Sequence, residues 1–386
     1  MPRRLAVIAL VTGLGAGVHV GVAQASTGWT LKAVPKPPGS ASGELYAVSC
    51  SAASACTAVG DYTDAAGVVL PLAERWNGHK WVVEATADPS GATGSYFDAV
   101  SCPSASACTA VGYYVNGSGL DVTMAEAWNG TRWVLQAVHE RTGTTTAFLE
   151  GVSCRSAAMC VAVGWDGGTT GTFTPETLAV RWDGVSWAIQ STPVASQGSL
   201  NAVSCSSPTA CTAVGAYESS AHVQVTLAER WNGTHWTIEP TQNPAGATDS
   251  ILSAVSCPTA SMCSAVGNSI SASNAAASVA EHWNGTSWSI VRSPGPTGAV
   301  ADFLSGVSCQ SSGSCTAVGW YDMSSGPSRT LAEGGSGTSW SVQRTPDAGT
   351  GLPNWLQSVA CSSPTTCTAV GKYNTGDHTE PLAERD

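Results

Sequence analysis

Charged residues are scarce in this sequence, and no segment has the hydrophobic periodicity of an amphipathic helix. Lys, Arg, Asp and Glu make up 11% of the 386 residues, and the formal net charge is −11. This deficit of positive charge argues against nucleic acid or an anionic membrane as a partner, because both bind basic surfaces. The composition favours tight turns and close-packed strands over helices with solvated faces.

Familiar catalytic motifs are missing as well. The sequence contains no His-Glu-x-x-His, no Gly-x-Ser-x-Gly and no phosphate-binding glycine loop, and its histidines stand at unrelated positions. We therefore predict no metal and no cofactor. A non-enzymatic protein becomes the first hypothesis.

One long apolar stretch is present, at the N-terminus. Arg3 and Arg4 precede an apolar, glycine-rich run to about Val22, and residues 23–25 (Ala-Gln-Ala) match a signal-peptidase site. We predict a signal peptide over residues 1–25 and a secreted, extracellular protein. A membrane anchor is the alternative, which the glycines and His19 disfavour. The arginine pair leaves twin-arginine export open beside the general secretory route.

Cysteine, in contrast, is abundant and regularly spaced. Five residues separate the two members of each pair, and successive pairs begin 52, 52, 51, 52, 52 and 52 residues apart. The seven pairs are Cys50 and Cys56, Cys102 and Cys108, Cys154 and Cys160, Cys205 and Cys211, Cys257 and Cys263, Cys309 and Cys315, and Cys361 and Cys367. A period of this length built from short β-rich runs is typical of one four-stranded propeller blade. We predict an all-β, seven-bladed β-propeller as a single domain over residues 26–386, with a linear solenoid as the competing fold.

The repeat also places four antiparallel strands in each blade, named A to D from the channel outward. Strand A ends at the first Cys and strand B begins at the second; strand C carries sequences such as Leu72-Ala-Glu-Arg-Trp76, and strand D starts near Trp81 and its equivalents. Asn77-Gly78 and its equivalents predict two-residue hairpin turns between strands C and D. The Glu of strand C recurs in six repeats, so we expect it to make a structural hydrogen bond.

The two ends of the chain predict how the ring closes. The last repeat stops within strand C at Asp386, whereas Trp29 lies as far before Cys50 as Trp81 lies before Cys102. Residues from Trp29 to about Val34 should therefore pair with the C-terminal strand and complete the last blade. This arrangement removes the two exposed edges of an open ring.

Each Cys pair spans one A–B hairpin, where neighbouring strands can bring the two Cβ atoms within bonding reach. We predict seven structural disulfides, which fit an oxidising compartment. Zinc and redox catalysis are disfavoured, because no His stands at a fixed spacing and all seven pairs are equivalent.

The binding face is predicted where the repeats differ. The B–C and D–A loops share one face and hold the length changes, and all eight Tyr fall in B–C loops or near the start of strand A. Trp165, Trp320 and Trp355, which lie outside the repeat pattern, fall there too. Aromatic side chains of this kind suit stacking on a sugar or a peptide.

A second set of variable residues stands four positions before the first Cys of each pair. Strand A is innermost, so these side chains should crowd the mouth of the central channel: Tyr46, Asp98, Glu150, Asn201, Ser253, Ser305 and Gln357. The predicted ligand-binding residues combine both sets: Tyr46, Asp98, Tyr113, Glu150, Trp165, Asn201, Trp320, Tyr321, Trp355 and Gln357.

Three functions fit this pattern. The first is a secreted, monomeric, non-enzymatic protein that recognises a glycan or an extracellular or surface protein through the B–C/D–A face. The second is a polysaccharide hydrolase or lyase, for which Asp98 and Glu150 on adjacent blades supply a pair of carboxyls. The third is a structural or protease-modulating partner in the cell envelope.

The repeat as a whole resembles that of secreted actinobacterial Cys-pair propeller proteins, most of which have no assigned function. The resemblance rests on Val-Ser-Cys, the paired Cys-Thr-Ala-Val-Gly and the Leu-Ala-Glu-Arg-Trp-Asn-Gly-x-x-Trp string, and it covers nearly the whole chain after residue 25. The architecture is similar to sialidase-type and kelch-type propellers, but their Asp-box and Gly-Gly signatures are missing. The resemblance therefore implies the fold and supplies no catalytic residue.

Overall fold

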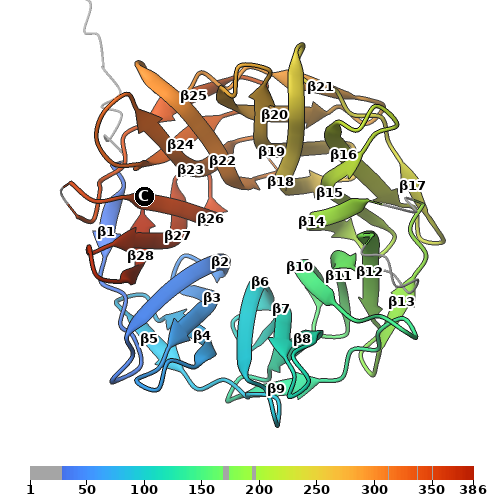
Figure 1. Ribbon diagram of the computed structural model, residues 1–386, viewed down its shortest axis with the longest axis vertical. Coiled ribbons are helices and arrows are strands. Elements are labelled where there is room, and N and C mark those ends of the chain that lie inside the picture. The colour runs from blue at the N-terminus through green and yellow to red at the C-terminus, as the bar shows by residue number, and fades with distance from the viewer. Residues whose placement is uncertain (1–27, 168–173, 194–196, 312, 337, 350) are drawn as a thin grey trace, which may run out of the picture.

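The computed structural model describes residues 28–167, 174–193, 197–311, 313–336, 338–349 and 351–386. These residues form 28 strands and no helix, arranged as seven blades around a central channel (Figure 1). Blades 4 and 5 are joined by one parallel bridge between Gln224 and Asp249. The prediction of an all-β, seven-bladed propeller is confirmed. The predicted signal peptide lies outside the described residues, and none of the described elements is a helix able to cross a membrane.

Each blade holds four antiparallel strands in sequence order from the channel outward, except that the last blade borrows its outermost strand. Blades 1 to 3 comprise β2 (Ser42–Ala52), β3 (Ala55–Thr63), β4 (Val69–Trp76), β5 (Trp81–Glu84); β6 (Gly94–Ser104), β7 (Ala107–Val115), β8 (Asp121–Trp128), β9 (Trp133–Gln136); and β10 (Ala147–Ser156), β11 (Met159–Asp166), β12 (Glu176–Trp182), β13 (Trp187–Gln190).

Blades 4 to 6 repeat the same order. They comprise β14 (Gly198–Ser207), β15 (Ala210–Glu218), β16 (Gln224–Trp231), β17 (Trp236–Ile238); β18 (Ala247–Thr259), β19 (Met262–Ser271), β20 (Ala276–Trp283), β21 (Trp288–Val291); and β22 (Ala299–Cys309), β23 (Cys315–Met323), β24 (Arg329–Gly335), β25 (Trp340–Gln343).

Blade 7 is a composite of both chain ends. Its sheet has the order β26 (Asn354–Ser363), β27 (Thr366–Asn374), β28 (Thr379–Arg385) and β1 (Thr30–Lys32). Figure 1 shows the blue β1 beside the red β28. Trp29 is 6% exposed, and its indole Nε1 donates to Oε1 of Gln343 in blade 6 at 3.0 Å. The predicted closure by the N-terminal strand is confirmed.

The predicted disulfides all form, each within its own A–B hairpin. The seven bonds join Cys50 to Cys56, Cys102 to Cys108, Cys154 to Cys160, Cys205 to Cys211, Cys257 to Cys263, Cys309 to Cys315, and Cys361 to Cys367. No cysteine is left free among the described residues. The prediction of hairpin disulfides is therefore confirmed for every pair.

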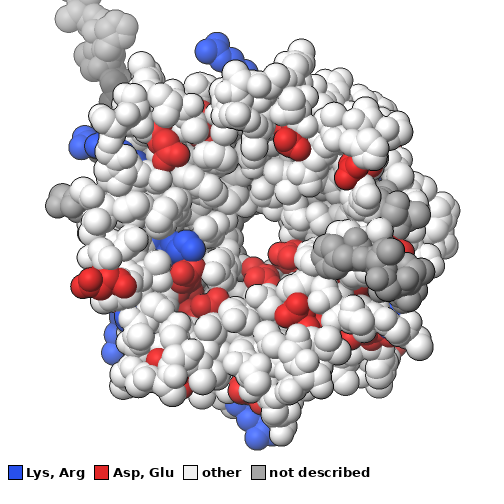
Figure 2. Space-filling model, in the orientation of Figure 1, with Lys and Arg blue, Asp and Glu red and all other residues white. Residues whose placement is uncertain are grey.

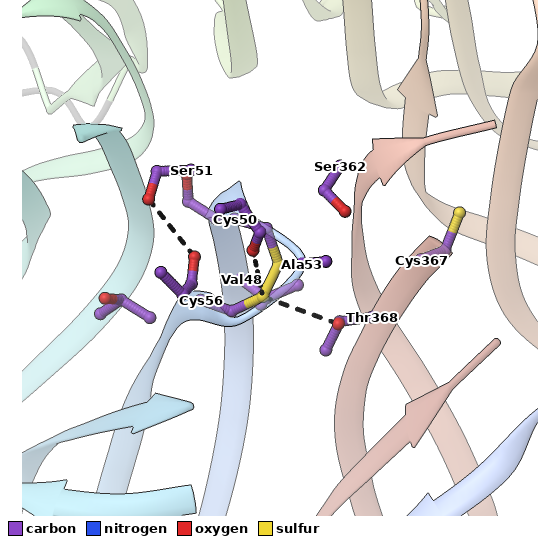
Figure 3. Close-up of a disulfide and its surroundings, with 12 residues drawn as sticks. Val48, Cys50, Ser51, Ala53, Cys56, Ser362, Cys367 and Thr368 are labelled. Carbon is purple, nitrogen blue, oxygen red and sulfur yellow. Dashed lines mark hydrogen bonds between the residues drawn. A yellow bond between two sulfur atoms is a disulfide. The ribbon is translucent and has the colours of Figure 1, made fainter. Parts of the chain in front are cut away.

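The disulfides also lie at the junctions between blades. The Ser49 hydroxyl accepts a hydrogen bond from the backbone N–H of Cys102 in the next blade at 2.9 Å, and five further junctions repeat this contact. Across the closing junction Ala360 occupies the Ser position, and Thr368 of blade 7 contacts the Cys56 sulfur of blade 1 at 3.7 Å (Figure 3). Each hairpin bond thus sits where one blade meets its neighbour.

The turns between strands C and D differ from the prediction. In blade 1, Trp76 pairs with Trp81, so four residues connect the strands, and only Gly78 takes a positive φ, of 94°. Oδ1 of Asn77 accepts from the backbone N–H groups of His79 and Lys80, both at 3.0 Å. The Asn side chain therefore accepts the hydrogen bonds that shape the turn. Asn77 itself does not take the positive φ that a two-residue turn would require.

The recurring Glu of strand C is buried between blades, but its hydrogen bonding is uneven. Glu333 accepts from the Ser293 hydroxyl and the Gly295 N–H, and Glu126 accepts from the Ala87 N–H, all in the segments that precede their blades. Glu74 is fully buried, and neither of its oxygens meets a donor among the described residues. The expected structural hydrogen bond is thus present in some blades and lacking in blade 1.

Candidate functional site

The seven variable residues of strand A all lie at the channel, and one local irregularity puts them there. In every blade the pairing between strands A and B slips by one residue at this position, for example between Leu45 and Ala47. Tyr46 and its six equivalents are therefore the extra residues of β-bulges. A bulge re-aims the side chain of the unpaired residue, which explains why these positions point away from the packed sheet.

The Gly of the recurring Val-Gly sequence permits this bulge. Gly60 of strand B pairs with Leu45, and a Cβ on Gly60 would lie 2.1 Å from the carbonyl oxygen of Glu44. The same close approach recurs at the equivalent glycine of every blade. Only glycine fits at this position, so the constant Val-Gly motif allows strand A to form the bulge that carries the variable residue.

Together the bulged residues line a cavity of about 240 Å³ at the channel. The lining includes Tyr46, Asp98, Glu150, Asn201, Ser253, Ser305 and Gln357, which places the predicted set as a continuous ring. Asn201 and Ser305 also donate to backbone carbonyls of strand A in the next blade, at 2.9 and 2.8 Å. These two side chains therefore help to fix the ring itself.

A second variable ring lies one strand further out, and sequence analysis identified only its aromatic members. It consists of the residue after the Val-Gly motif in strand B: Asp61, Tyr113, Trp165, Ala216, Asn268, Trp320 and Lys372. Each lies beside strand A just before the bulge, where Tyr113 pairs with Tyr96 and Lys372 pairs with Trp355. The signal was available in the sequence, because this position changes from blade to blade beside constant neighbours.

Aromatic rings from these positions form a row across blades 2 and 3. Tyr96 stacks on Tyr113 with ring centroids 4.6 Å apart, and Tyr113 and Phe148 form a T-shaped pair with centroids 4.5 Å apart. Phe148 in turn stacks on Trp165 at 4.5 Å. All four rings are half-buried, so they are held in place by one another and still reach solvent. Phe303 and Trp320 form a separate stacked pair in blade 6.

Carboxyl groups gather on the same side of the channel. Asp98 and Glu150 interact, and burial followed by the charge of Glu150 raises the pKa of Asp98 well above its ordinary value. Burial also raises the pKa of Glu150, although a hydrogen bond from the Trp165 indole at 3.3 Å partly lowers it. Burial and the charge of Glu44 raise the pKa of Asp61 to about 7. Figure 2 shows acidic side chains on one side of the channel opening.

Blade 7 contributes the positive charge of the site. Nζ of Lys372 donates to Oε2 of Glu44 at 2.5 Å and lies 5.8 and 5.9 Å from the ring centroids of Tyr46 and Trp355. Burial opposes ionisation of Glu44, but hydrogen bonds from Lys372 and Tyr46 outweigh it and lower the pKa of Glu44. Lys372 is therefore already neutralised by Glu44.

The structure moves several predicted aromatic residues out of the loops. Trp165, Trp320 and Trp355 lie on strands β11, β23 and β26, beside the bulges, and none of the three lines the channel cavity itself. Tyr321 instead packs against the core of blade 6 and borders a groove beside Trp29. Four other tyrosines, at the equivalent positions of their blades, also pack on the cores: Tyr62, Tyr114, Tyr217 and Tyr373. Part of the variable B–C and D–A segments of blade 3 (168–173 and 194–196) lies outside the described residues.

The arrangement offers carboxyls, aromatic rings and amide or hydroxyl groups. Across the described ranges, no group of three or more His, Cys, Asp or Glu side chains is placed to hold a metal ion. The chemistry is that of a recognition site or, through Asp98 and Glu150, of proton transfer between paired carboxyls.

Comparison with known proteins supports the fold. No family model and no curated protein matches the sequence. A polysaccharide lyase of family PL25, an ulvan lyase solved with a bound -[GlcA(1-4)Rha3S]- fragment, is 7% identical with a TM-score of 0.55 and 92% of each chain covered. The β-propeller domain of the Trilobed protease from Pyrococcus furiosus is 8% identical with a TM-score of 0.51, covering 89% of this chain and 97% of that one.

A fucose-specific lectin from Aleuria aurantia is more distant in structure. It is 13% identical with a TM-score of 0.43, covering 79% of this chain and 97% of the lectin. Identities as low as those of the lyase and the protease domain establish a shared β-propeller architecture and nothing beyond it. Any function must be argued from the channel-mouth residues.

Proposed function

We propose that this protein is a secreted, non-enzymatic glycan-binding protein whose site is the channel mouth, meaning the bulged ring of strand A together with the aromatic and charged ring of strand B. One observation carries the proposal. All seven blades use a β-bulge to present a variable side chain to one shared cavity, while the surrounding motif stays constant. A purely structural role would not need side chains that differ among equivalent positions.

The side-chain chemistry supports a glycan as the ligand class. Half-buried aromatic rings offer flat apolar edges and faces for sugar rings, and Asn201, Gln357 and the carboxyls offer directional hydrogen bonds to hydroxyl groups. Seven disulfides point to an oxidising environment, in keeping with an extracellular ligand.

Glycan-array binding of the purified protein tests the proposal. Trp165→Ala, Trp320→Ala and Trp355→Ala should each weaken binding to the same glycans. Trp182→Ala is the matched control, because Trp182 lies at the end of strand C, where its indole donates to the Ala157 carbonyl of the A–B hairpin on the opposite rim. Binding that survives all three channel-mouth variants, or that fails equally in the control, would contradict the assignment.

A second function is favoured by the raised pKa values of Asp98 and Glu150. A carboxyl that stays protonated near neutral pH can serve as a general acid for hydrolysis or elimination on a polysaccharide. Turnover of a polysaccharide that disappears in Asp98→Asn or Glu150→Gln would establish this function in place of simple binding. Capture of a protein with no glycan bound would instead support an extracellular protein partner or a cell-envelope role.

A further inference from the structure

The channel mouth gathers more carboxyls than basic groups, so that ionisation of these carboxyls lacks support from the protein. Carboxyls of three successive blades, Asp61, Asp98 and Glu150, face the same space, and no basic group contributes to the pKa of Asp98 or Glu150. Among the described residues the nearby ammonium is that of Lys372, which is engaged by Glu44 at 2.5 Å. Among the described residues, the acidic side of the mouth therefore has one counter-charge, that of Lys372, which acts on Asp61 and is already engaged by Glu44.

One atom in this group also lacks a hydrogen-bond donor. Oδ2 of Asp98 is buried and meets no donor among the described residues, although Asp98 lines the cavity. A polar group left buried without its partner destabilises the protein. A bound group that donates hydrogen bonds and carries positive charge would satisfy both deficits.

The aromatic row restricts what that group can be. Tyr113 and Trp165 stand beside Asp98 and Glu150, and Trp165 donates directly to Glu150 at 3.3 Å. Electron-rich ring faces next to carboxylates attract organic ammonium groups. A neutral hydroxyl would supply the donor but not the charge, and a uronic acid or sulfated sugar would be repelled.

We propose that the glycan recognised at the channel mouth carries a free, protonated amino group, so that the ligand class is an amino sugar that is not N-acetylated. This inference rests on the proposed glycan-binding function. The cavity of about 240 Å³ is smaller than the ~300–1,000 Å³ of pockets that enclose drug-sized ligands. It accommodates a single sugar, which makes the end of a chain or one exposed residue the recognised element.

The test compares ligands of one backbone that differ in charge. β-1,4-linked glucosamine oligomers, their fully N-acetylated counterparts and oligoglucuronate are titrated into the disulfide-intact protein by calorimetry. The pH is kept near neutral, because the raised pKa values of Asp61 and Asp98 leave these carboxyls protonated in mild acid. The free amine should bind at least about tenfold more tightly than the acetylated oligomer, the equivalent of one charge-assisted hydrogen bond. Oligoglucuronate should not bind.

Variants connect the preference to the carboxyls. Asp98→Asn and Glu150→Gln should each reduce the preference for the amine several-fold. Asp377→Asn removes the same charge from an exposed B–C loop of blade 7 and should leave the preference unchanged.

Equal affinity for the free and acetylated oligomers, or a preference that persists in both carboxyl variants, would overturn the inference while leaving glycan binding intact. Failure of the glucosamine oligomer to bind overturns it as well, and the glycan array then decides separately whether any glycan is bound. Oligolysine that competes with the same dependence on Asp98 would also overturn it, because the amine would then belong to a peptide and not to a sugar.

Discussion

The buried Glu74 makes a quantitative prediction about stability and pH. Glu281 and Glu384 lie near the hydroxyls of Thr226 and Thr330 in the preceding blade, whereas the equivalent residue opposite Glu74 is Pro381, which has no hydroxyl. Burial without a donor raises the pKa of Glu74 from 4.5 to about 9. The carboxyl is therefore protonated in the folded protein at neutral pH.

The sign of the effect follows from linkage between proton binding and folding. Below pH 4.5 the carboxyl is protonated in both states and adds no pH dependence to the free energy of unfolding. Between pH 4.5 and about 9 the unfolded chain ionises first, so the free energy of unfolding falls by about 1.4 kcal/mol per pH unit. At pH 7.5 the accumulated loss is on the order of 4 kcal/mol.

Glu74→Gln keeps the side-chain volume and removes the titration. The difference in unfolding free energy between the variant and the wild type, measured in urea at several pH values, should grow in favour of the variant by about 4 kcal/mol between about pH 4.5 and 7.5. Any constant cost of burying the amide cancels in this comparison. Glu333→Gln is the control, because Glu333 accepts two hydrogen bonds and should show a weaker pH dependence. A difference that stays constant within about 1 kcal/mol, with the same urea dependence, would refute the reasoning.

Three further predictions concern the closing junction, each measured by urea unfolding. Trp29→Ala should lower the free energy of unfolding by about 3–5 kcal/mol because the side chain is buried. Leu31→Ala, close to it in the chain and 42% exposed, should lower it by less than about 1 kcal/mol. Equal losses would mean that the N-terminal strand does not close the ring. Ala360→Ser should restore the inter-blade hydrogen bond missing at this junction and stabilise the protein by about 0.5–1.5 kcal/mol. Ser101→Ala, which removes the same bond from an ordinary junction, should cost about 1–3 kcal/mol. Destabilisation by Ala360→Ser would contradict the role assigned to this bond. Arg385 donates to the carbonyl of Ala53 at 2.6 Å and covers the indole of Trp76. Arg385→Lys should therefore lower the free energy of unfolding by about 1–2 kcal/mol. No loss would show that these contacts are not formed in solution.

The sequence was sufficient for the blade count, the disulfides and the closing strand, because each depends on a spacing that repeats. The pairing of Cys108 with Cys102, for example, follows from a separation that every other blade shares. The ring of bulged residues could also be located, since Asp98 and Glu150 vary beside constant neighbours. The bulge itself was not predictable, because strand alternation alone does not reveal which residue is left unpaired.

Strand geometry explains the placement of two kinds of side chain that the sequence pattern did not reveal. Tyr321 was assigned to the binding face, but it follows Trp320 in strand B, and successive residues of a strand point to opposite faces. Trp320 therefore stacks on Phe303 on one face of the blade, while Tyr321 packs on the core from the other. Asp61 and Lys372 were missed because they are neither aromatic nor on strand A.

Hydrogen–deuterium exchange with a bound glycan tests the central claim, that the channel mouth is the binding site, most directly. With the strongest ligand from the array at saturation, protection should appear in strands A and B around the bulges, at residues 94–98, 112–115 and 147–150. The A–B hairpins and the outer strands β5, β9 and β13 should be unchanged. Protection confined to the disulfide rim or to the outer strands would contradict the account.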